Sequence, residues 1–398
     1  GVLLMAVLQQ EQLVGLLKRY EEEMIQLRRH FHENPELSFE EIETPKTIAA
    51  FHRALGHEVR EGVGGNGVVA KLVGAKAGKT VALRADFDAL AITEETGLPF
   101  QSKIKGRMHA CGHDGHTASL LILAKALNQM KDNLAGTIVF IHQHAEELAP
   151  GGAKSMIADG CLEGVDVIFG THLWAPTELG KVQTAIGPFM AAADGIYIKI
   201  KGKGGHGSNP SDTKDSILLA AQFITNLQQL VARRINPLRP AVVSVGHIEA
   251  LNPFNVIADQ VYMKGTVRTF HEEERDLLER EIEELLKATC YLTKADYEYE
   301  FRRGYPPVVN HAAETEHVMA SARKVADVEA VEFVDPTMGG EDFAYYLEEI
   351  PGAFFFTGAK NPAWQEVYPH HHPKFDIDER SLRIAANVLG QATLDYLA

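Results

Sequence analysis

The feature that most constrains the fold is a change in hydrophobic patterning near the middle of the chain. Up to about residue 190, apolar strand-like runs alternate with segments of helical periodicity. The predicted strands are 68–73, 80–85, 137–143 and 165–171, and the predicted helices are 8–32, 45–55, 116–131 and 151–160. Alternation of this kind favours an α/β domain built on a mostly parallel sheet.

Residues 191–304 follow a different pattern. Apolar and polar residues alternate over 196–201, and the next predicted elements are a helix at 212–234, strands at 241–249 and 258–270, and a helix at 271–290. A last strand carries the alternating aromatic residues Tyr297, Tyr299 and Phe301. The order β-α-β-β-α-β is that of a ferredoxin-like unit. Because the α/β pattern resumes at about 305, we predict one α/β domain formed by 1–190 and 305–398, with 191–304 inserted as a second domain.

Length and charge limit the class of protein. The length of 398 residues exceeds what one hydrophobic core usually organises. With 39 basic and 54 acidic residues the formal net charge is −15, which argues against nucleic acid or an anionic membrane as the main partner. No apolar run approaches the roughly 20 residues that span a bilayer, and the first residues lack the features of a signal peptide. The three cysteines suit a reducing compartment. We therefore expect a soluble cytoplasmic protein.

Segment 111–116, Cys-Gly-His-Asp-Gly-His, has the composition of a metal-binding loop. Thiol, imidazole and carboxylate groups bind zinc and its first-row neighbours. Cys111 and His113 stand two residues apart on a glycine-flanked loop just before a predicted helix. Asp114 and His116 have two open interpretations: they orient a ligand imidazole, or they cap and begin the helix. The other two cysteines are interpreted as ordinary core or surface thiols.

Further residues of metal-ligand type follow the predicted strands. They are Asp86 and Asp88 after strand 80–85, Glu146 and Glu147 after strand 137–143, and His172 after strand 165–171. Loops at the carboxyl ends of strands collect functional residues in open α/β sheets. We therefore expect these side chains to meet the Cys111 loop at one edge of the sheet.

The neighbouring acids Glu146 and Glu147 are candidates for a ligand and a base. Adjacent side chains on an extended stretch diverge, so one carboxylate can face a metal while the other faces a water molecule. Metal-assisted hydrolysis needs both groups, because one holds the ion and the other takes a proton from the water. A bare Glu-Glu pair is more often a solvated acidic loop. Its place after an apolar strand, near other ligand types, favours the functional interpretation.

Four weaker signals lie elsewhere in the chain. The triple histidine His370–His372 can supply one or two ligands. A glycine-rich loop lacks the Walker and dinucleotide-binding spacings and instead presents His206 as a hydrogen-bond donor. Arg268, in the same inserted block as Asn255, is either a bidentate partner for a substrate carboxylate or an exposed cation. The tight turn 339–343 contains two acids.

These residues give the chain a family resemblance. It resembles the aminoacylase, hippurate hydrolase and carboxypeptidase group of metal-dependent amidohydrolases. The likeness is strongest to bacterial N-acyl-L-amino-acid amidohydrolases and thermostable carboxypeptidases, with plant indoleacetyl-amino-acid hydrolases further away. It covers nearly the whole chain, and its strongest segments are Met108–His116, Gln143–Glu147, Gly170–Trp174, Lys203–Gly207, Gly339–Phe343 and His371–Pro373.

The resemblance implies a di-metal peptidase-like α/β domain with the inserted block as a lid that also forms a homodimer or a larger homo-oligomer. One or two divalent ions (zinc, manganese or cobalt) would be held by Cys111, His113, Glu147, His172 and His371. Cys111 is a candidate bridge between two ions. His371 is chosen because it stands two residues before Pro373, as the family's ligand does.

The resemblance also implies residue roles in catalysis. Glu146 would be the general base and later the acid, and His206 would stabilise the oxyanion in its own subunit or across a dimer. Asn255 and Arg268 would contact the carboxylate end of the substrate. The residues expected to support the ligands are Asp86, Asp114 and Glu341.

The implied reaction is hydrolysis of the amide bond of N-acyl-L-amino acids, with acetyl, benzoyl or related acyl groups. One alternative is a dipeptidase or carboxypeptidase acting on small peptides, and a remote one is a non-catalytic metal-binding scaffold.

Two positions depart from the family pattern. Ser211 follows Pro210 where many relatives carry a second histidine, and Arg84 stands where sister branches place a metal-binding histidine.

Overall fold

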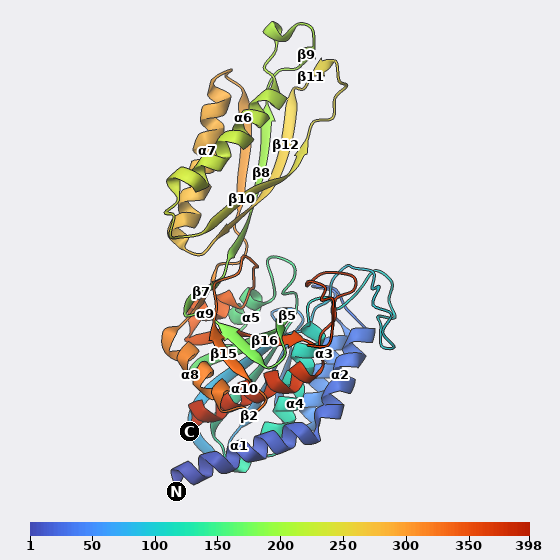
Figure 1. Cartoon of the computed structure of the whole chain (residues 1–398), viewed down its shortest axis with the longest axis vertical. Helices are drawn as coiled ribbons and strands as arrows, with labels where there is room; N and C mark the ends of the chain where they lie inside the picture. The colour runs from blue at the N-terminus through green and yellow to red at the C-terminus, as the bar shows by residue number, and fades with distance from the viewer. The chain divides into compact units, whose positions relative to one another are not determined.

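The computed structural model describes residues 1–398, which divide into two compact units (Figure 1). The larger unit contains Gly1–Gly187, Val309–Asp335 and Asp342–Ala398, and the smaller unit contains Pro188–Val308 and Pro336–Glu341. The sequence places 336–341 with the α/β domain, whereas this segment packs with the smaller unit. The Thr337 amide donates to the Phe189 carbonyl at 3.0 Å, and the Ala191 amide donates to the Gly339 carbonyl at 3.1 Å. None of the helices has both the length and the apolar character needed to cross a membrane.

The larger unit is built on one sheet of eight strands, in the order β1-β2-β4-β3-β5-β16-β6-β15. Strand β3 is parallel to β4 and β5, β5 to β16, and β6 to β15, while the other neighbouring pairs are antiparallel. The strands are β1 (Glu58–Val63), β2 (Gly67–Val73), β3 (Lys76–Asp86), β4 (Ala135–Gln143), β5 (Val167–Glu178), β6 (Lys181–Thr184), β15 (Ala330–Phe333) and β16 (Gly352–Lys360). The predicted α/β class is confirmed, with parallel strands at the centre of the sheet.

Two helices, α4 and α10, cover the centre of this sheet on one face. Both contact β3 and β5 as well as each other, and α1 and α2 pack outside them (Figure 1). All of α4 except Lys125 and Asn128 is buried, which fits a helix enclosed between a sheet and a second helical layer. The helices are α1 (Val2–Arg19), α2 (Glu21–Glu33), α3 (Glu43–Ala54), α4 (His113–Asn128), α5 (Ala153–Ala158), α8 (Ala312–Arg323), α9 (Ala344–Glu349) and α10 (Arg380–Leu397).

Two predicted elements differ from the observed ones. The helix predicted at 8–32 is interrupted at Tyr20, which separates α1 from α2. Strand β5 continues to Glu178, seven residues beyond the predicted end at 171, because it stays paired with β16 through His172↔Phe356 and Trp174↔Gly358. His172 therefore lies inside a strand and not in the loop after it.

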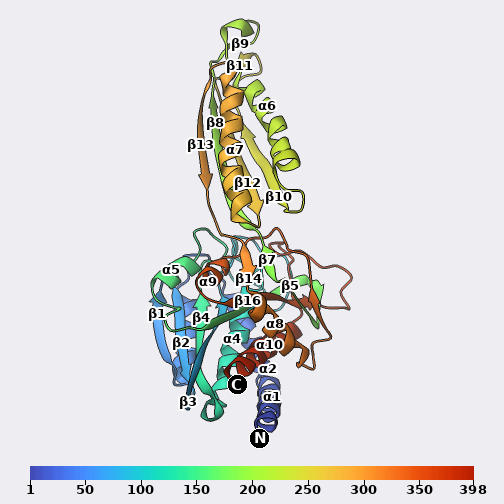
Figure 2. The ribbon, with the colours of Figure 1, turned by 90° about the vertical axis from the view of Figure 1, so that its left-hand side faces the viewer.

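The smaller unit has the predicted β-α-β-β-α-β order. Its sheet has the strand order β10-β12-β8-β13, and α6 and α7 lie side by side on one face (Figure 2). Strands β9 and β11 form a separate two-stranded ribbon. The elements are β8 (Ala192–Lys201), β9 (Gly205–His206), α6 (Ser216–Gln229), β10 (Ala241–Glu249), β11 (Val256–Ile257), β12 (Gln260–Thr269), α7 (Glu272–Tyr291) and β13 (Asp296–Arg302). Short strands β7 (Gly187–Met190) and β14 (Val308–Asn310) lie where the chain passes between the units.

A chain of three buried histidines ties α3 and β4 to α4 in the larger unit. The Asn128 side-chain oxygen lies 3.0 Å from His57 Nε2, so that nitrogen donates and His57 Nδ1 accepts from His52 Nδ1 at 3.0 Å. His52 Nε2 then accepts from His142 Nε2 at 2.9 Å, and His142 Nδ1 accepts from the Thr117 hydroxyl at 3.1 Å. In its neutral form, each imidazole of this chain has one possible tautomer.

Candidate metal centre

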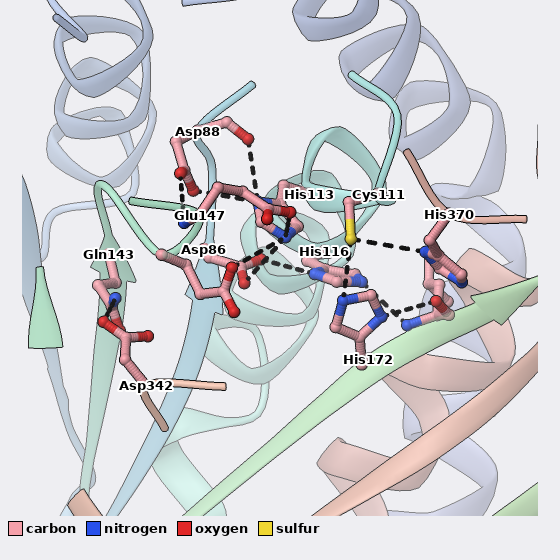
Figure 3. A network of polar contacts seen from close by, with 12 residues as sticks. Asp86, Asp88, Cys111, His113, His116, Gln143, Glu147, His172, Asp342 and His370 are labelled. Atoms are coloured by element: carbon pink, nitrogen blue, oxygen red, sulfur yellow. Dashed lines mark hydrogen bonds and ion pairs between the residues drawn. The ribbon is translucent and has the colours of Figure 1, made fainter. Parts of the chain in front are cut away.

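The candidate site lies where central strands of the larger unit meet the start of α4 (Figure 3). Asp86 ends β3, Gln143 ends β4, and His172 comes from β5. Gly112 precedes α4 with φ of 92°, a left-handed conformation that glycine adopts without a steric cost. This turn brings Cys111 and His113 to the same edge of the sheet, as predicted from the strand ends.

His113 places its Nε2 among three carboxylates, and despite burial the charges of Asp86, Asp88 and Glu147 raise the pKa of its ring well above the usual value. Its Nδ1 lies 2.9 Å from the Asp88 carbonyl and 3.0 Å from the Asp88 carboxylate, so Nδ1 carries the hydrogen. Its Nε2 lies 3.3 Å from Asp86 Oδ2, 3.4 Å from Glu147 Oε1 and 3.9 Å from Glu146 Oε2. Both His113 Nε2 and Asp86 Oδ2 are buried without a hydrogen-bond partner. Buried polar atoms are rarely left unpaired, so a bound cation explains this arrangement.

Cys111 faces two imidazoles. Its Sγ lies 3.5 Å from His172 Nε2 and 3.5 Å from His370 Nδ1 (Figure 3). His172 Nδ1 donates to the Leu173 carbonyl at 2.7 Å, which leaves Nε2 as a lone pair directed toward the sulfur. Burial and the nearby Glu147 and Glu146 carboxylates raise the pKa of the Cys111 thiol well above its usual value. A thiolate at this position therefore requires a compensating positive charge.

Glu147 and His371 complete the set of predicted ligands. His371 Nε2 lies 3.2 Å from Glu147 Oε1. One ligand atom each from Cys111, Glu147 and His371 lie within 4.8 Å of one another, as do those of Cys111, His113 and His172. The five predicted ligands therefore form two overlapping clusters around Cys111. A mixed set of thiolate, imidazole and carboxylate fits a first-row divalent ion.

Glu146 and Glu147 lie in a turn, not on the extended stretch that was predicted. Ala145 adopts φ of 52°, and the Glu147 amide donates to Asp88 Oδ2 at 2.9 Å. Both carboxylates consequently point toward His113 instead of diverging. Glu146 is buried and shares a third cluster of possible ligand atoms with His113 and Glu147. This position next to the predicted ligands is what a general base requires.

His116 and Asp114, the two loop residues with two possible roles in the sequence, have different surroundings. His116 Nδ1 lies 2.6 Å from Asp86 Oδ1, and its Nε2 accepts the Leu173 amide at 2.9 Å, so neither nitrogen is left for a metal. His116 links Asp86 to β5 and thereby positions the neighbouring His172. Asp114 does not contact the predicted ligands. It accepts from Arg28 Nε at 2.9 Å and from His32 Nδ1 at 2.8 Å, which anchors α2 on α4.

Two supporting groups lay outside the predicted site set. Asp88 was noted after strand 80–85 but given no role, although it holds both His113 and the backbone of Glu147. Arg84 occupies the place of the missing histidine and donates to Gln143 Oε1 at 2.8 Å and to Asp342 Oδ1 at 2.9 Å. Gln143 in turn donates to Asp342 Oδ2 at 2.7 Å (Figure 3). The turn 339–343 signalled an acid here, and Asp342 is the one bound to Arg84.

Glu341 belongs to the segment that packs with the smaller unit and is buried. Its predicted role as support for the ligands stays a prediction. In the same unit, His206 Nδ1 accepts from the Ser208 amide at 3.1 Å, so the hydrogen of the neutral ring is on Nε2, a possible donor. Asn255 lies beside it, because its carbonyl accepts from the Gly207 amide at 2.8 Å.

Arg268 lies far from that pair within the smaller unit. It is paired with Ala193 at one end of β8, whereas the chain leaves the other end at Lys201 before reaching His206. Eight residues of strand separate the two ends, or about 26 Å at 3.3 Å per residue. Its guanidinium donates to the Thr266 hydroxyl at 3.1 Å and to the Met338 carbonyl at 3.3 Å. One copy of this unit therefore cannot place Asn255 and Arg268 on the same carboxylate group.

An α/β sheet that gathers thiol, imidazole and carboxylate groups at its strand ends, with a further carboxylate beside them, defines a metal-dependent hydrolase. The chain belongs to peptidase family M20/M25/M40, whose family model matches residues 82–395. It is 55% identical over 375 residues to YhaA of Bacillus subtilis, which covers 94% of this chain and 95% of that protein. It is 45% identical over 301 residues to an N-acyl-L-amino acid amidohydrolase of Geobacillus stearothermophilus, covering 76% and 81%.

The fold also matches a crystal structure of Bacillus subtilis YxeP, described as a dinuclear metal-binding peptidase of the M20 family. The TM-score is 0.84 with 36% identity, and the match covers 96% of this chain and 99% of that one. The family resemblance and the class of enzyme predicted from the sequence are thereby confirmed.

Proposed function

We propose that the protein hydrolyses the amide bond of N-acyl-L-amino acids and releases a carboxylic acid and a free amino acid. The observation that carries this proposal is the buried Glu146 carboxylate, 3.9 Å from the unpaired His113 Nε2 and beside the five predicted ligands. A base next to a cation site suits hydrolysis by an activated water molecule. The relatedness to an N-acyl-L-amino acid amidohydrolase and to N-acetyl-L-cysteine deacetylase of Bacillus subtilis supports the substrate class.

The residues would divide the reaction as follows. A divalent ion held by Cys111, His113, Glu147, His172 and His371 supplies Lewis acidity when bound, which acidifies water and polarises a carbonyl group. Glu146 takes a proton from the attacking water and delivers it to the nitrogen of the leaving amine, so that the C–N bond breaks to give a neutral amine. His206 donates its Nε2 hydrogen to the oxyanion that develops on the carbonyl oxygen. One or two zinc, manganese or cobalt ions suit this ligand set.

Replacing Glu146 with Gln tests the assignment of the base. The variant keeps the shape of the side chain but cannot accept the proton, so we expect kcat to fall about 10²–10⁴-fold. Metal content, measured on the same samples, should stay unchanged because Glu146 is not among the five proposed ligands. Glu349→Gln, an exposed substitution in the same unit, is the matched control. Full activity of Glu146→Gln would refute the assignment.

Carboxypeptidase or dipeptidase activity is the second candidate, since the sequence is also related to thermostable carboxypeptidases. A panel of acetyl-, benzoyl- and indoleacetyl-amino acids, compared with dipeptides and N-blocked dipeptides, separates these activities. Higher kcat/KM for the acyl-amino acids is the expected result. Preference for peptides with a free amine would overturn the leading proposal in favour of the second.

The three free and buried cysteines support a reducing, cytoplasmic location.

A homodimer accounts for the separation between Arg268 and the pair formed by His206 and Asn255. The two ends of the smaller unit, about 26 Å apart along β8, can serve one substrate if they come from different chains. Strand β10 is an edge strand of its sheet and carries the exposed Ile248, and α6 exposes Ile217 and Leu218. Exposed apolar edges of this kind suit a self-complementary interface.

Mixing two inactive variants tests the proposed action across the dimer. His206→Ala and Glu146→Ala homodimers each lack one group at every site. If His206 acts on the partner's substrate, a heterodimer has one complete site, and random mixing restores about a quarter of wild-type activity. If His206 acts in its own subunit, no site is complete and mixing restores nothing. A monomeric mass with full activity would also contradict the proposal.

A further inference from the structure

The three neighbouring histidines near the C-terminus differ in role. We infer that His370 is a positioning residue for Cys111: it donates an N–H···S hydrogen bond that holds the sulfur in place as a metal ligand, and it does not bind the metal. The inference rests on the proposed metal centre. It extends that centre by a residue to which the sequence assigned no role.

The backbone fixes the tautomer of His370. The Ala175 amide lies 3.0 Å from His370 Nε2, and a backbone amide can only donate, so this nitrogen is an acceptor without a hydrogen. The neutral ring must then carry its hydrogen on Nδ1. That atom lies 3.5 Å from Cys111 Sγ, within hydrogen-bonding distance of a sulfur acceptor. The N–H group therefore faces the sulfur, and the ring also interacts with the backbone of Cys111.

His172 shows the opposite arrangement at the same sulfur. Its Nδ1 donates to the Leu173 carbonyl at 2.7 Å, so its Nε2 points to the Cys111 sulfur as a lone pair, 3.5 Å away. A lone pair can bind a cation, whereas an N–H group cannot. Figure 3 shows both rings joined to the sulfur by dashed lines, and only the backbone contacts behind them distinguish a ligand from a hydrogen-bond donor.

Aromatic packing holds the His370 ring in this orientation. Trp174 stacks on it with ring centroids 4.6 Å apart and planes at 28°, and Phe375 contacts it at 4.8 Å and 45°. Trp174 is itself stacked on Phe356 at 4.0 Å with planes at 2°. A rotated ring would lose the Ala175 contact and disturb this stack. The ring therefore cannot readily turn its N–H group away from the Cys111 sulfur and present a lone pair instead.

A hydrogen bond to a thiolate stabilises its charge and lowers the energy of its electron pairs. Without the bond, the sulfur is no longer held in place for the metal, and it donates electron density to the metal more readily. We therefore expect weaker apparent metal binding at neutral pH. In the Co²⁺-loaded protein, we also expect the sulfur-to-metal charge-transfer band to move to lower energy.

His370→Phe removes the donor and keeps a ring that can stack on Trp174. Titration of the metal-free variant with Co²⁺, followed by near-ultraviolet absorption, should show the band at longer wavelength and an affinity about tenfold below wild type. His370→Asn replaces the ring with an amide N–H near the position of Nδ1 and should restore part of both properties. His372→Ala is the matched control, because His372 stacks on Tyr368 and has no contact with the sulfur.

The outcomes separate this inference from the proposed function. A charge-transfer band that stays at the wild-type position in His370→Phe, with unchanged affinity, overturns the role of His370. A wild-type protein that shows no such band overturns Cys111 as a ligand and the inference with it, whatever substrates are cleaved. If His370→Phe does not fold, as judged by circular dichroism, the Asn variant decides. A band near the wild-type wavelength with an affinity near that of the wild type in His370→Asn supports the donor role. A band shifted to longer wavelength together with a large loss of affinity overturns it.

Discussion

Acid should destabilise the larger unit through its chain of three histidines. Burial, and then the neighbouring His142 and His57, lower the pKa of His52 to about 2, and burial lowers that of His142 to about 3. The unfolded chain therefore binds more protons than the folded one below the ordinary histidine pKa of about 6.5. The stability contributed by these neutral rings is present above that pH and is lost as the pH falls below it.

The magnitude depends little on the folded pKa values, because both lie well below pH 5. Each histidine then loses about 1.4 kcal/mol of unfolding free energy per pH unit below 6.5, or about 2 kcal/mol at pH 5. His52 and His142 together amount to about 4 kcal/mol. Replacing His52 with Gln should remove about half of this. A glutamine amide offers one acceptor to His142 and one donor to His57, so the hydrogen-bond chain can persist without a titrating group.

Urea unfolding of the metal-free protein at pH 7 and pH 5 measures the effect. Fluorescence is a suitable probe because both tryptophans, Trp174 and Trp364, belong to the larger unit. Other groups titrate as well, so the decisive quantity is the difference between wild type and His52→Gln. His30→Gln, on the exposed face of α2, is the control. If His52→Gln keeps the full pH dependence of the wild type, the three histidines are not the acid-sensitive element and the reasoning is refuted.

Three further results are expected. Asp88→Asn weakens the contacts that orient His113 and the Glu147 backbone and should lower metal affinity about 10–100-fold by calorimetry, and unchanged affinity would contradict this role. Arg84→Met leaves Asp342 buried without its ion pair and should lower the unfolding free energy by about 3–5 kcal/mol in urea, so a loss below 1 kcal/mol would speak against it. A divalent ion at 100 times its Kd should stabilise the protein by about 2.7 kcal/mol and raise Tm, whereas Cys111→Ala should show a much smaller rise at the same metal concentration.

The site residues that come directly after a strand in the sequence were predictable from the sequence alone. Strands β3 and β4 are buried apolar runs of the parallel centre of the sheet, and the polar residues after them fall at its carboxyl edge. The end of β5 was missed because its pairing with β16 depends on residues almost two hundred positions later. The hydrophobic pattern around β5 contains no information about a pairing partner so far away in the sequence.

The roles of His116, Asp114 and His370 could not be settled from spacing. Each is decided by a contact with a distant segment: the Leu173 amide, the Arg28 guanidinium and the Ala175 amide, respectively. A histidine is a ligand or a donor according to which nitrogen a neighbour occupies, and the sequence carries no information on that neighbour. The fold of the inserted unit was easier to predict, because its alternating strands and amphipathic helices are regular over long stretches.

The smaller unit is not a single continuous insertion, since Pro336–Glu341 packs with it from a later part of the chain. A chimera that exchanges Pro188–Val308 between relatives would leave this short segment from the original parent. Its amide and carbonyl groups would then face a foreign segment 189–191, where Phe189 and Ala191 now bond Thr337 and Gly339. Exchange of the unit between family members must therefore carry two separate stretches of gene, and substitutions in one stretch constrain those tolerated in the other.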